Sequence, residues 1–216
     1  MGHEGMALAA IRYLRANPAP EPYQPAESYQ PARPALRAVR PDERMPEAGD
    51  LADGLLRSVL GHFCTGVTVV SAIAEDATPV GFACQSFSSL SLDPPLVSFS
   101  VARSSASWPR IARAGTFCVS ILAADQLPVC RAFAVSGATG VDKFAGVDWT
   151  PAPGSGAPRL AGALAWVDCA IHAVHTGGDH LIVLGRVGAL AVNREEAGPL
   201  LFYRGGLRGG FGELTR

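Results

Sequence analysis

The residues best suited to chemistry form a run of small and hydroxylated side chains, ACQSFSSLS, at positions 83–91. Small side chains let a flat ligand lie against the backbone, where amide and hydroxyl groups can form hydrogen bonds to its edges. Apolar, strand-like sequence flanks the run on both sides. Two interpretations stay open: the run is one wall of a flat pocket, or its serines cover a turn that faces solvent.

A second group of candidate binding residues follows in ARSSASWPR, and consists of Arg103, Ser104, Ser105 and Ser107. A helix is expected to begin near Ser107, because Pro109 is tolerated in a first helical turn. An arginine, several hydroxyls and helix N-terminal amides together suit a phosphate. A flat pocket wall next to a phosphate site would fit a flavin nucleotide, which has a planar ring system and a phosphate.

The sequence contains no motif for several other common kinds of catalytic or binding site. There is no Gly-x-Gly-x-x-Gly after a strand, no phosphate loop, no Gly-x-Ser-x-Gly elbow and no His-Glu-x-x-His. His172 and His175 lie on one predicted strand at odd spacing, so they face opposite sides, and no metal site is expected. His180 follows a Gly-Gly-Asp turn, where its ring either contacts a ligand or faces solvent. The triplet Asp142-Lys143-Phe144 is either a loop anchor or a contact for the flavin tail.

Composition limits the partners and the compartment. The formal net charge is −1, and the aromatic residues are not interleaved with basic ones, so no nucleic acid partner is expected. No apolar run approaches the length of a membrane span, which predicts no membrane partner. The cysteines are far apart and form no Cys-x-x-Cys pair, which predicts reduced thiols and a cytoplasmic location. They are Cys64, Cys84, Cys118, Cys130 and Cys169.

Residues 1–50 and 51–216 differ in amino-acid composition. Residues 1–50 hold eight of the seventeen prolines and predict an N-terminal arm that is flexible or wraps a partner subunit, with Tyr23 and Tyr29 as anchors in the second case. Residues 51–216 predict one globular domain. Its first segment, LADGLLRSVLGHF, has the spacing of a helix with one buried face formed by Leu51, Leu55, Val59, Leu60 and Phe63.

The remainder of the domain predicts an antiparallel barrel or sandwich with few helices. Apolar and β-branched runs indicate strands over 67–74, 79–84, 96–102, 116–122 and 199–203. Two long strands, over 162–176 and 180–192, are expected to pair around a Gly-Gly-Asp turn. A second short helix is expected over 124–134, followed by a long Gly/Pro-rich loop over 135–162.

Seven segments occur in an order that resembles the flavin reductase family of FMN-binding split-barrel proteins. They are FCTGVTVVSA, GFACQSFSSLSLDPPLVSFSV, ILAADQ, DKFAGVDW, GALAWVDC, GGDH and PLLFYRG. The resemblance covers about residues 55–205. It implies a mainly β fold, a six-stranded antiparallel Greek-key split barrel with a few short helices, and a homodimer.

The resemblance also implies a role for each candidate residue. In such proteins, the segment that matches Ala83-Cys84-Gln85-Ser86 lies against the isoalloxazine ring. Ser89 and Ser91 are expected to continue that wall. Arg103, Ser104, Ser105 and Ser107 match the phosphate side. His180 and Tyr203 match positions beside the nicotinamide. Many relatives have Thr-Ala-Asn where this chain has Ala83-Cys84-Gln85, which shifts the expected amide contact.

The implied activity is that of an NAD(P)H:flavin oxidoreductase with FAD or FMN as cofactor and NADH, or NADPH, as co-substrate. Hydride passes from nicotinamide to flavin, and reduced flavin then serves a separate oxygenase component that hydroxylates a phenolic or aromatic substrate. Two alternatives stay open. One is a flavin carrier or redox sensor without nicotinamide turnover, and the other is a barrel-shaped interaction protein without a ligand.

Overall fold

The computed structural model describes residues 53–135 and 142–210 of the 216-residue chain. The predicted arm, residues 1–50, lies outside the described residues. None of the helices in the described ranges is long and apolar enough to cross a membrane.

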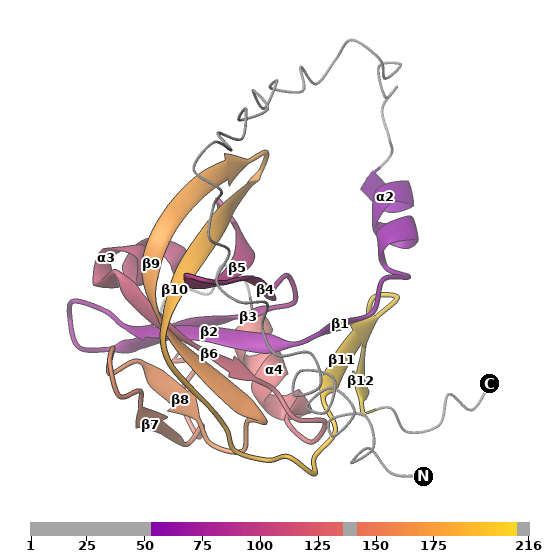
Figure 1. Cartoon of the computed structure of the whole chain (residues 1–216). Coiled ribbons are helices and arrows are strands. Elements are labelled where there is room, and N and C mark those ends of the chain that lie inside the picture. The colour runs from indigo at the N-terminus through magenta and orange to yellow at the C-terminus, as the bar shows by residue number, and fades with distance from the viewer. Residues whose placement is uncertain (1–52, 136–141, 211–216) are drawn as a thin grey trace, which may run out of the picture. The chain divides into compact units, whose positions relative to one another are not determined.

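The described chain is mainly β, with antiparallel strands and three short helices between them (Figure 1). The helices are α2 (Asp53–Leu60), α3 (Trp108–Ala114) and α4 (Leu127–Ala134). The strands are β1 (Thr65–Gly66), β2 (Thr68–Ile73), β3 (Pro79–Cys84), β4 (Ser88–Leu92), β5 (Pro95–Ala102), β6 (Thr116–Ile121), β7 (Trp149–Pro151), β8 (Pro158–Leu160), β9 (Ala165–Gly177), β10 (His180–Val192), β11 (Leu200–Tyr203) and β12 (Gly206–Gly209). The mainly β class predicted from the sequence is confirmed.

The largest sheet has seven strands in the order β3-β2-β6-β9-β10-β5-β4, and every neighbouring pair is antiparallel. The predicted hairpin of two long strands is β9–β10, with Gly177 paired to His180 around the turn. The seventh strand, one more than expected, is β4. Its serines pair with β5, for example Ser88 with Ser98, so this part of the hydroxylic run is an edge strand rather than a turn.

One end of this sheet, at β3, is tied to β5 near the other end. Ser86, just beyond the end of β3, accepts a hydrogen bond from the Ser100 amide at 2.8 Å and donates one to the Ser100 carbonyl at 3.1 Å. Phe82 and Phe99 also pack with ring centroids 6.0 Å apart. Four strands separate β3 from β5 in the sheet order, so these contacts curl the sheet into a barrel.

The barrel interior is filled by aromatic and branched side chains. Burial alternates along β5, so that Val97, Phe99 and Val101 point inward, as the two-residue period of a strand requires. Phe99 contacts Phe117 and Trp108 edge to face, at centroid distances of 5.3 and 6.2 Å. Burying a side chain of this size contributes about 1.5–3 kcal/mol.

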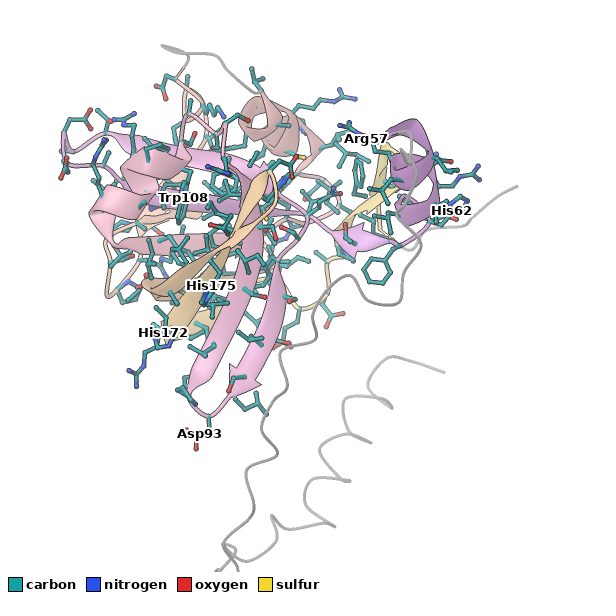
Figure 2. The ribbon with its side chains drawn as sticks, turned by 90° about the horizontal axis from the view of Figure 1, so that it is seen from above. Arg57, His62, Asp93, Trp108, His172 and His175 are labelled. Carbon is teal, nitrogen blue, oxygen red and sulfur yellow. The ribbon has the colours of Figure 1, made fainter. Side chains whose placement is uncertain are left out.

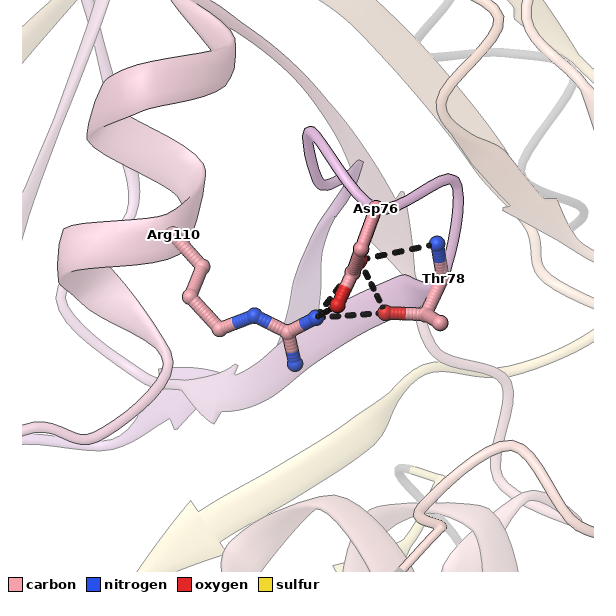
Figure 3. A network of polar contacts seen from close by, with 3 residues as sticks. All are labelled: Asp76, Thr78 and Arg110. Atoms are coloured by element: carbon pink, nitrogen blue, oxygen red, sulfur yellow. Dashed lines mark hydrogen bonds and ion pairs between the residues drawn. The ribbon is translucent and has the colours of Figure 1, made fainter.

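Helix α3 is fixed to the β2–β3 turn by a polar network (Figure 3). Nη2 of Arg110 donates to both carboxylate oxygens of Asp76, at 2.8 and 2.7 Å, and to the hydroxyl of Thr78. The helix ends at Gly115, whose φ of 70° is the left-handed conformation that glycine adopts without strain. These contacts hold the segment that leads into α3, which carries the serines of the predicted phosphate side.

Helix α2 is present as predicted, but its apolar face is not buried by the described part of the chain. Its exposed apolar side chains are Leu55 (56%), Leu56 (48%), Val59 (60%), Leu60 (61%) and, just beyond the helix, Phe63 (76%). The prediction of a face buried within the domain is therefore wrong for the described residues. Figure 2 marks this segment by Arg57 and His62.

The long loop expected over 135–162 contains a two-stranded sheet, β7–β8, in its described part. A buried carboxylate anchors the tip of this sheet. Asp168 on β9 accepts hydrogen bonds from the amides of Gly154 and Ser155, at 2.8 and 3.1 Å, and from the Ser155 hydroxyl. A buried carboxylate with several donors is compensated for its lost hydration, so this contact is structural.

Candidate active site

A cavity of about 350 Å³ opens where the ends of β3, β5 and α4 meet the segment before α3. It contains residues from both groups singled out in the sequence. The predicted site residues that line it are Ala83, Cys84, Gln85, Ser86, Ser104, Ser105, Ser107 and His180. Residues 97 positions apart in the chain are thus brought to one place, because β10 pairs with β5 and places His180 opposite Ala102.

The other predicted site residues lie elsewhere. Ser89 and Ser91 are on β4, opposite Val97 and Leu96, and are not among the lining residues. The side chain of Arg103 is exposed and does not line the cavity. Tyr203 lies on β11, in the separate β1-β11-β12 sheet, where its ring meets the ring of His62 edge to face at 6.4 Å.

The wall formed by the end of β3 is made of small side chains. Cys84 is buried, and its Sγ atom lies 3.3 Å from the Ser86 hydroxyl. Burial raises the pKa of the Cys84 thiol, so the group is protonated and neutral near pH 7. Since a thiolate is the reactive form, Cys84 contributes shape rather than a nucleophile.

The backbone beyond Cys84 leaves the strand ladders at the edge of the cavity. The β2–β3 ladder ends at Cys84, and the β4–β5 ladder begins at Ser88. Gln85, Ser86 and Phe87 lie between the two ladders, and Gln85 and Ser86 line the cavity. A backbone segment beside small side chains fits the hydrogen-bonding edge of a planar heteroaromatic ring such as a flavin.

The serines before α3 are partly used in holding that helix. Ser105 accepts a hydrogen bond from the Trp108 amide at 3.3 Å, and Ser107 donates to the Gly81 carbonyl at 3.0 Å. A hydroxyl has one proton to donate. Ser105 therefore keeps its proton for a ligand in the cavity, whereas Ser107 has already given its proton to the protein.

His180, at the start of β10, is the histidine that lines the cavity. Its Nδ1 atom lies 2.8 Å from Oδ1 of Asp179, and the imidazole is 45% exposed. The hydrogen bond from His180 lowers the pKa of the Asp179 carboxyl, which is therefore ionised near neutral pH. An ionised carboxylate only accepts, so Nδ1 carries the proton and Nε2 is left as the unprotonated ring nitrogen of the neutral imidazole.

The other histidines of β9 do not join this site. His172 and His175 are exposed on the β9–β10 hairpin, and neither lines the cavity (Figure 2). Within residues 53–135 and 142–210, no three His, Cys, Asp or Glu side chains are grouped to hold a metal ion.

Sequence reasoning missed part of the lining. Residues Ser100–Ala102 of β5 had been assigned only to a strand, and Phe133, Ala134 and Val135 at the end of α4 only to a helix. Their position in the site depends on pairing between distant segments, which no local pattern reveals. Lys143 also lines the cavity. The signal for it was present in the triplet Asp142-Lys143-Phe144, whose role the sequence left open.

Comparison with known families gives a match that covers most of the described chain. The model of the flavin reductase like domain matches residues 60–210, which include the whole cavity. The chain belongs to the flavin reductase family. The resemblance noted in the sequence, and with it the class of the enzyme as a flavin-reducing oxidoreductase, is confirmed.

Several members of this flavin reductase family are similar over most of their length. The chain is 54% identical over 149 residues to the reductase subunit HsaB of a flavin-dependent monooxygenase from Rhodococcus jostii, covering 69% of this chain and 73% of that protein. It is 50% identical to a solved homologue of nitrilotriacetate monooxygenase component B from Mycobacterium thermoresistibile, with a TM-score of 0.66 and coverage of 70% and 83%.

A third relative was solved with fragments of its ligands. It is the NADH:FAD oxidoreductase SgcE6 of Streptomyces globisporus, in complex with NAD and FAD fragments. That structure is 40% identical, with a TM-score of 0.67, and the match covers 74% of this chain and 94% of that one. The split-barrel fold predicted for this flavin reductase is confirmed by these structural neighbours.

Proposed function

We propose that this flavin reductase oxidises NADH, reduces FAD or FMN, and supplies the reduced flavin to a separate monooxygenase that acts on a phenolic or aromatic substrate. The observation that carries the proposal is the gathering of Ala83–Ser86, Ser105 and His180 around one cavity. The names of similar proteins support both halves of it, since one is an NADH-dependent FAD reductase and another a monooxygenase reductase subunit.

When bound, the flavin supplies the hydride acceptor and the nicotinamide the donor, so the protein needs no nucleophile of its own. The small residues at the end of β3 let a flat ring system approach the barrel. The hydrogen bond from His180 to Asp179 leaves Nε2 to orient a polar group of the nicotinamide nucleotide. Alignment of two bound reactants is itself a large catalytic effect, and these residues act in that way.

The activity is tested by following NADH absorbance with purified protein and FAD, FMN or no added flavin. We expect turnover only when a flavin is added, and faster turnover with NADH than with NADPH. Flavin binding without nicotinamide oxidation would instead support a carrier or redox sensor. Coupling to a relative's oxygenase component, with phenolic substrates as candidates, then tests the second half of the proposal.

We also propose a homodimer. Leu55, Val59 and Leu60 on α2 and Phe63 after it expose an apolar surface that a partner subunit would cover. The Val59→Glu and Leu60→Glu double variant should shift the mass in multi-angle light scattering from dimer to monomer. Ser58→Glu, on the same helix, adds a charge at a polar position and should leave the mass unchanged. A monomeric wild type at micromolar concentration contradicts the proposal.

All five cysteines are free, and four of them are buried. Unpaired buried thiols persist where the surroundings are reducing. This supports the cytoplasm as the place where the reductase works.

A further inference from the structure

One cationic side chain, Lys143, lines the cavity and has no role in the proposed hydride transfer. Of the lysine and arginine side chains in the described ranges, Lys143 alone lines it. The sequence had assigned the phosphate to Arg103 with Ser104, Ser105 and Ser107. The serines line the cavity, but the Arg103 side chain is exposed and outside the lining. A positive charge strengthens hydrogen bonds to a phosphate or diphosphate, and Lys143 lines the cavity where it can provide one.

The ammonium group of Lys143 has a weak partner within the described chain. Its Nζ atom donates to the carbonyl of Phe133, at the C-terminal end of α4, at 3.3 Å. The ion pairs found among the described residues join other side chains: Arg110 with Asp76, His180 with Asp179 and Arg194 with Asp125. Two of the three N–H donors of the ammonium thus remain for a ligand.

Partial burial makes this cation costly without an anion. Burial lowers the pKa of the Lys143 ammonium, because the charged form loses hydration that the Phe133 carbonyl replaces in part. A charged group in such surroundings is stabilised by a counter-ion that also accepts hydrogen bonds. A phosphate oxygen meets both requirements.

The backbone of Lys143 is held in place on both sides. Asp142 accepts a hydrogen bond from the Phe144 amide at 2.9 Å, and the buried Phe144 ring meets Phe133 edge to face at 4.8 Å. These contacts fix the chain at Lys143 against the end of α4. The ammonium is therefore presented from a rigid support, which a binding group requires.

We propose that Lys143 binds a phosphate group of the nucleotide held in this cavity, together with the free hydroxyl of Ser105. The proposal rests on the proposed function and deepens it. The phosphate belongs either to the flavin nucleotide or to the nicotinamide dinucleotide, and both present the same chemistry. A purely structural role for Lys143, as a charge at the C-terminal end of α4, is the alternative that the experiment must separate.

The experiment uses flavins with and without phosphate. Affinities of the full chain for riboflavin, FMN and FAD are measured by flavin fluorescence without NADH, for the wild type and for Lys143→Met. We expect FMN and FAD to bind about 10-fold more weakly to the variant, as loss of one charge-assisted hydrogen bond predicts, with riboflavin unchanged. Lys143→Arg, which keeps the charge, should recover most of the loss.

A second arm identifies the nicotinamide as the source of the phosphate. If the flavin affinities stay unchanged, KM is compared for NADH and for reduced nicotinamide riboside, which lacks phosphate. A KM for NADH that rises in Lys143→Met, with no change for the riboside, also supports the proposal. Arg131→Met, which removes an exposed cation from α4, is the matched control and should alter neither quantity.

The proposal is overturned if Lys143→Met changes none of these quantities, or if it weakens riboflavin as much as FMN. The second result, with a lowered melting temperature of the ligand-free protein, would assign Lys143 to the structure of α4. Because the flavin affinities are measured without NADH, a failure of NADH turnover would sink the proposed activity and leave this result standing.

Discussion

The Nδ1 atom of His180 donates a hydrogen bond to Oδ1 of Asp179 at 2.8 Å, at the turn between the two longest strands of the barrel. The same turn is tied to β5, since the Arg103 amide donates to the Asp179 carbonyl at 3.0 Å. The imidazole at the cavity is therefore oriented through its neighbour in the chain, and the neighbour is positioned by the barrel.

Replacing this imidazole should affect the nicotinamide more than the flavin. His180→Ala is expected to raise KM for NADH about 10-fold, the effect of one lost polar contact, and to leave FAD affinity within a factor of two. Asp179→Asn keeps the ring but weakens its orientation, and should give a smaller rise. Steady-state kinetics and flavin fluorescence provide the two readouts. Unchanged NADH kinetics in His180→Ala would remove the residue from the site.

Ser86 combines a cavity position with a structural task. Its hydroxyl forms two hydrogen bonds to the Ser100 backbone, which close the barrel between β3 and β5. Ser86→Ala should therefore lower the free energy of unfolding by about 1–2 kcal/mol, because two backbone groups lose their partner. Urea denaturation measures the loss. Ser89→Ala, on the neighbouring edge strand β4, is the control and should change stability by less than about 0.5 kcal/mol.

The case of Ser86 shows what the sequence can and cannot provide. The hydroxylic run was visible in the sequence because small residues between apolar strands are a local signal, and its members Ala83–Ser86 line the cavity. The bonds to Ser100 were not predictable, since they join strands that are separated by four others in the sheet order. For the same reason, Ser89 and Ser91 were placed in the wall, although their strand pairs with β5 outside the cavity.

Other elements also show that local features were predictable from the sequence, whereas contacts between distant segments were not. The period of two along β5 and the Gly-Gly-Asp turn after β9 predicted these strands, because both signals act between near neighbours. The period of α2 also predicted a helix, but amphipathicity does not say which surface covers the apolar face. Lys143 was ambiguous because its burial depends on the Phe133–Phe144 contact between two separate segments.

A glycine on β10 tests the packing of the barrel interior. A methyl group at Gly185 would press on the buried ring of Phe117 and lie 3.2 Å from Val97, so something must shift. Gly185→Ala should destabilise the protein by about 1–3 kcal/mol, the usual cost of overpacking a core. On the same strand, the nearest atom to a methyl group at Gly188 is the Asp168 carbonyl oxygen at 3.8 Å, so Gly188→Ala is the matched control. Equal unfolding free energies for the two variants would contradict this account of the core.

The network at the start of α3 gives a pH dependence whose sign can be worked out. Hydrogen bonds from Thr78 and, to a smaller extent, the Arg110 guanidinium lower the pKa of the Asp76 carboxyl in the folded protein (Figure 3). A folded pKa below the unfolded value of about 3.9 means that the ionised carboxylate stabilises the fold above that pH. The stabilisation is then lost as the pH falls through the lowered pKa.

Asp76→Asn removes this ionisable group and nearly preserves its shape. The variant should melt below the wild type at neutral pH. The difference should begin to shrink as the pH falls below about 3.9, and approach zero below the lowered pKa, where the folded wild-type carboxyl is also protonated. Melting temperatures of both proteins across this range measure the effect. The gap at neutral pH should be small, because Asp76 is at the surface and high salt screens its charge. A gap that stays constant down to the lowest pH would mean that the carboxylate's charge does not hold α3 to the β2–β3 turn.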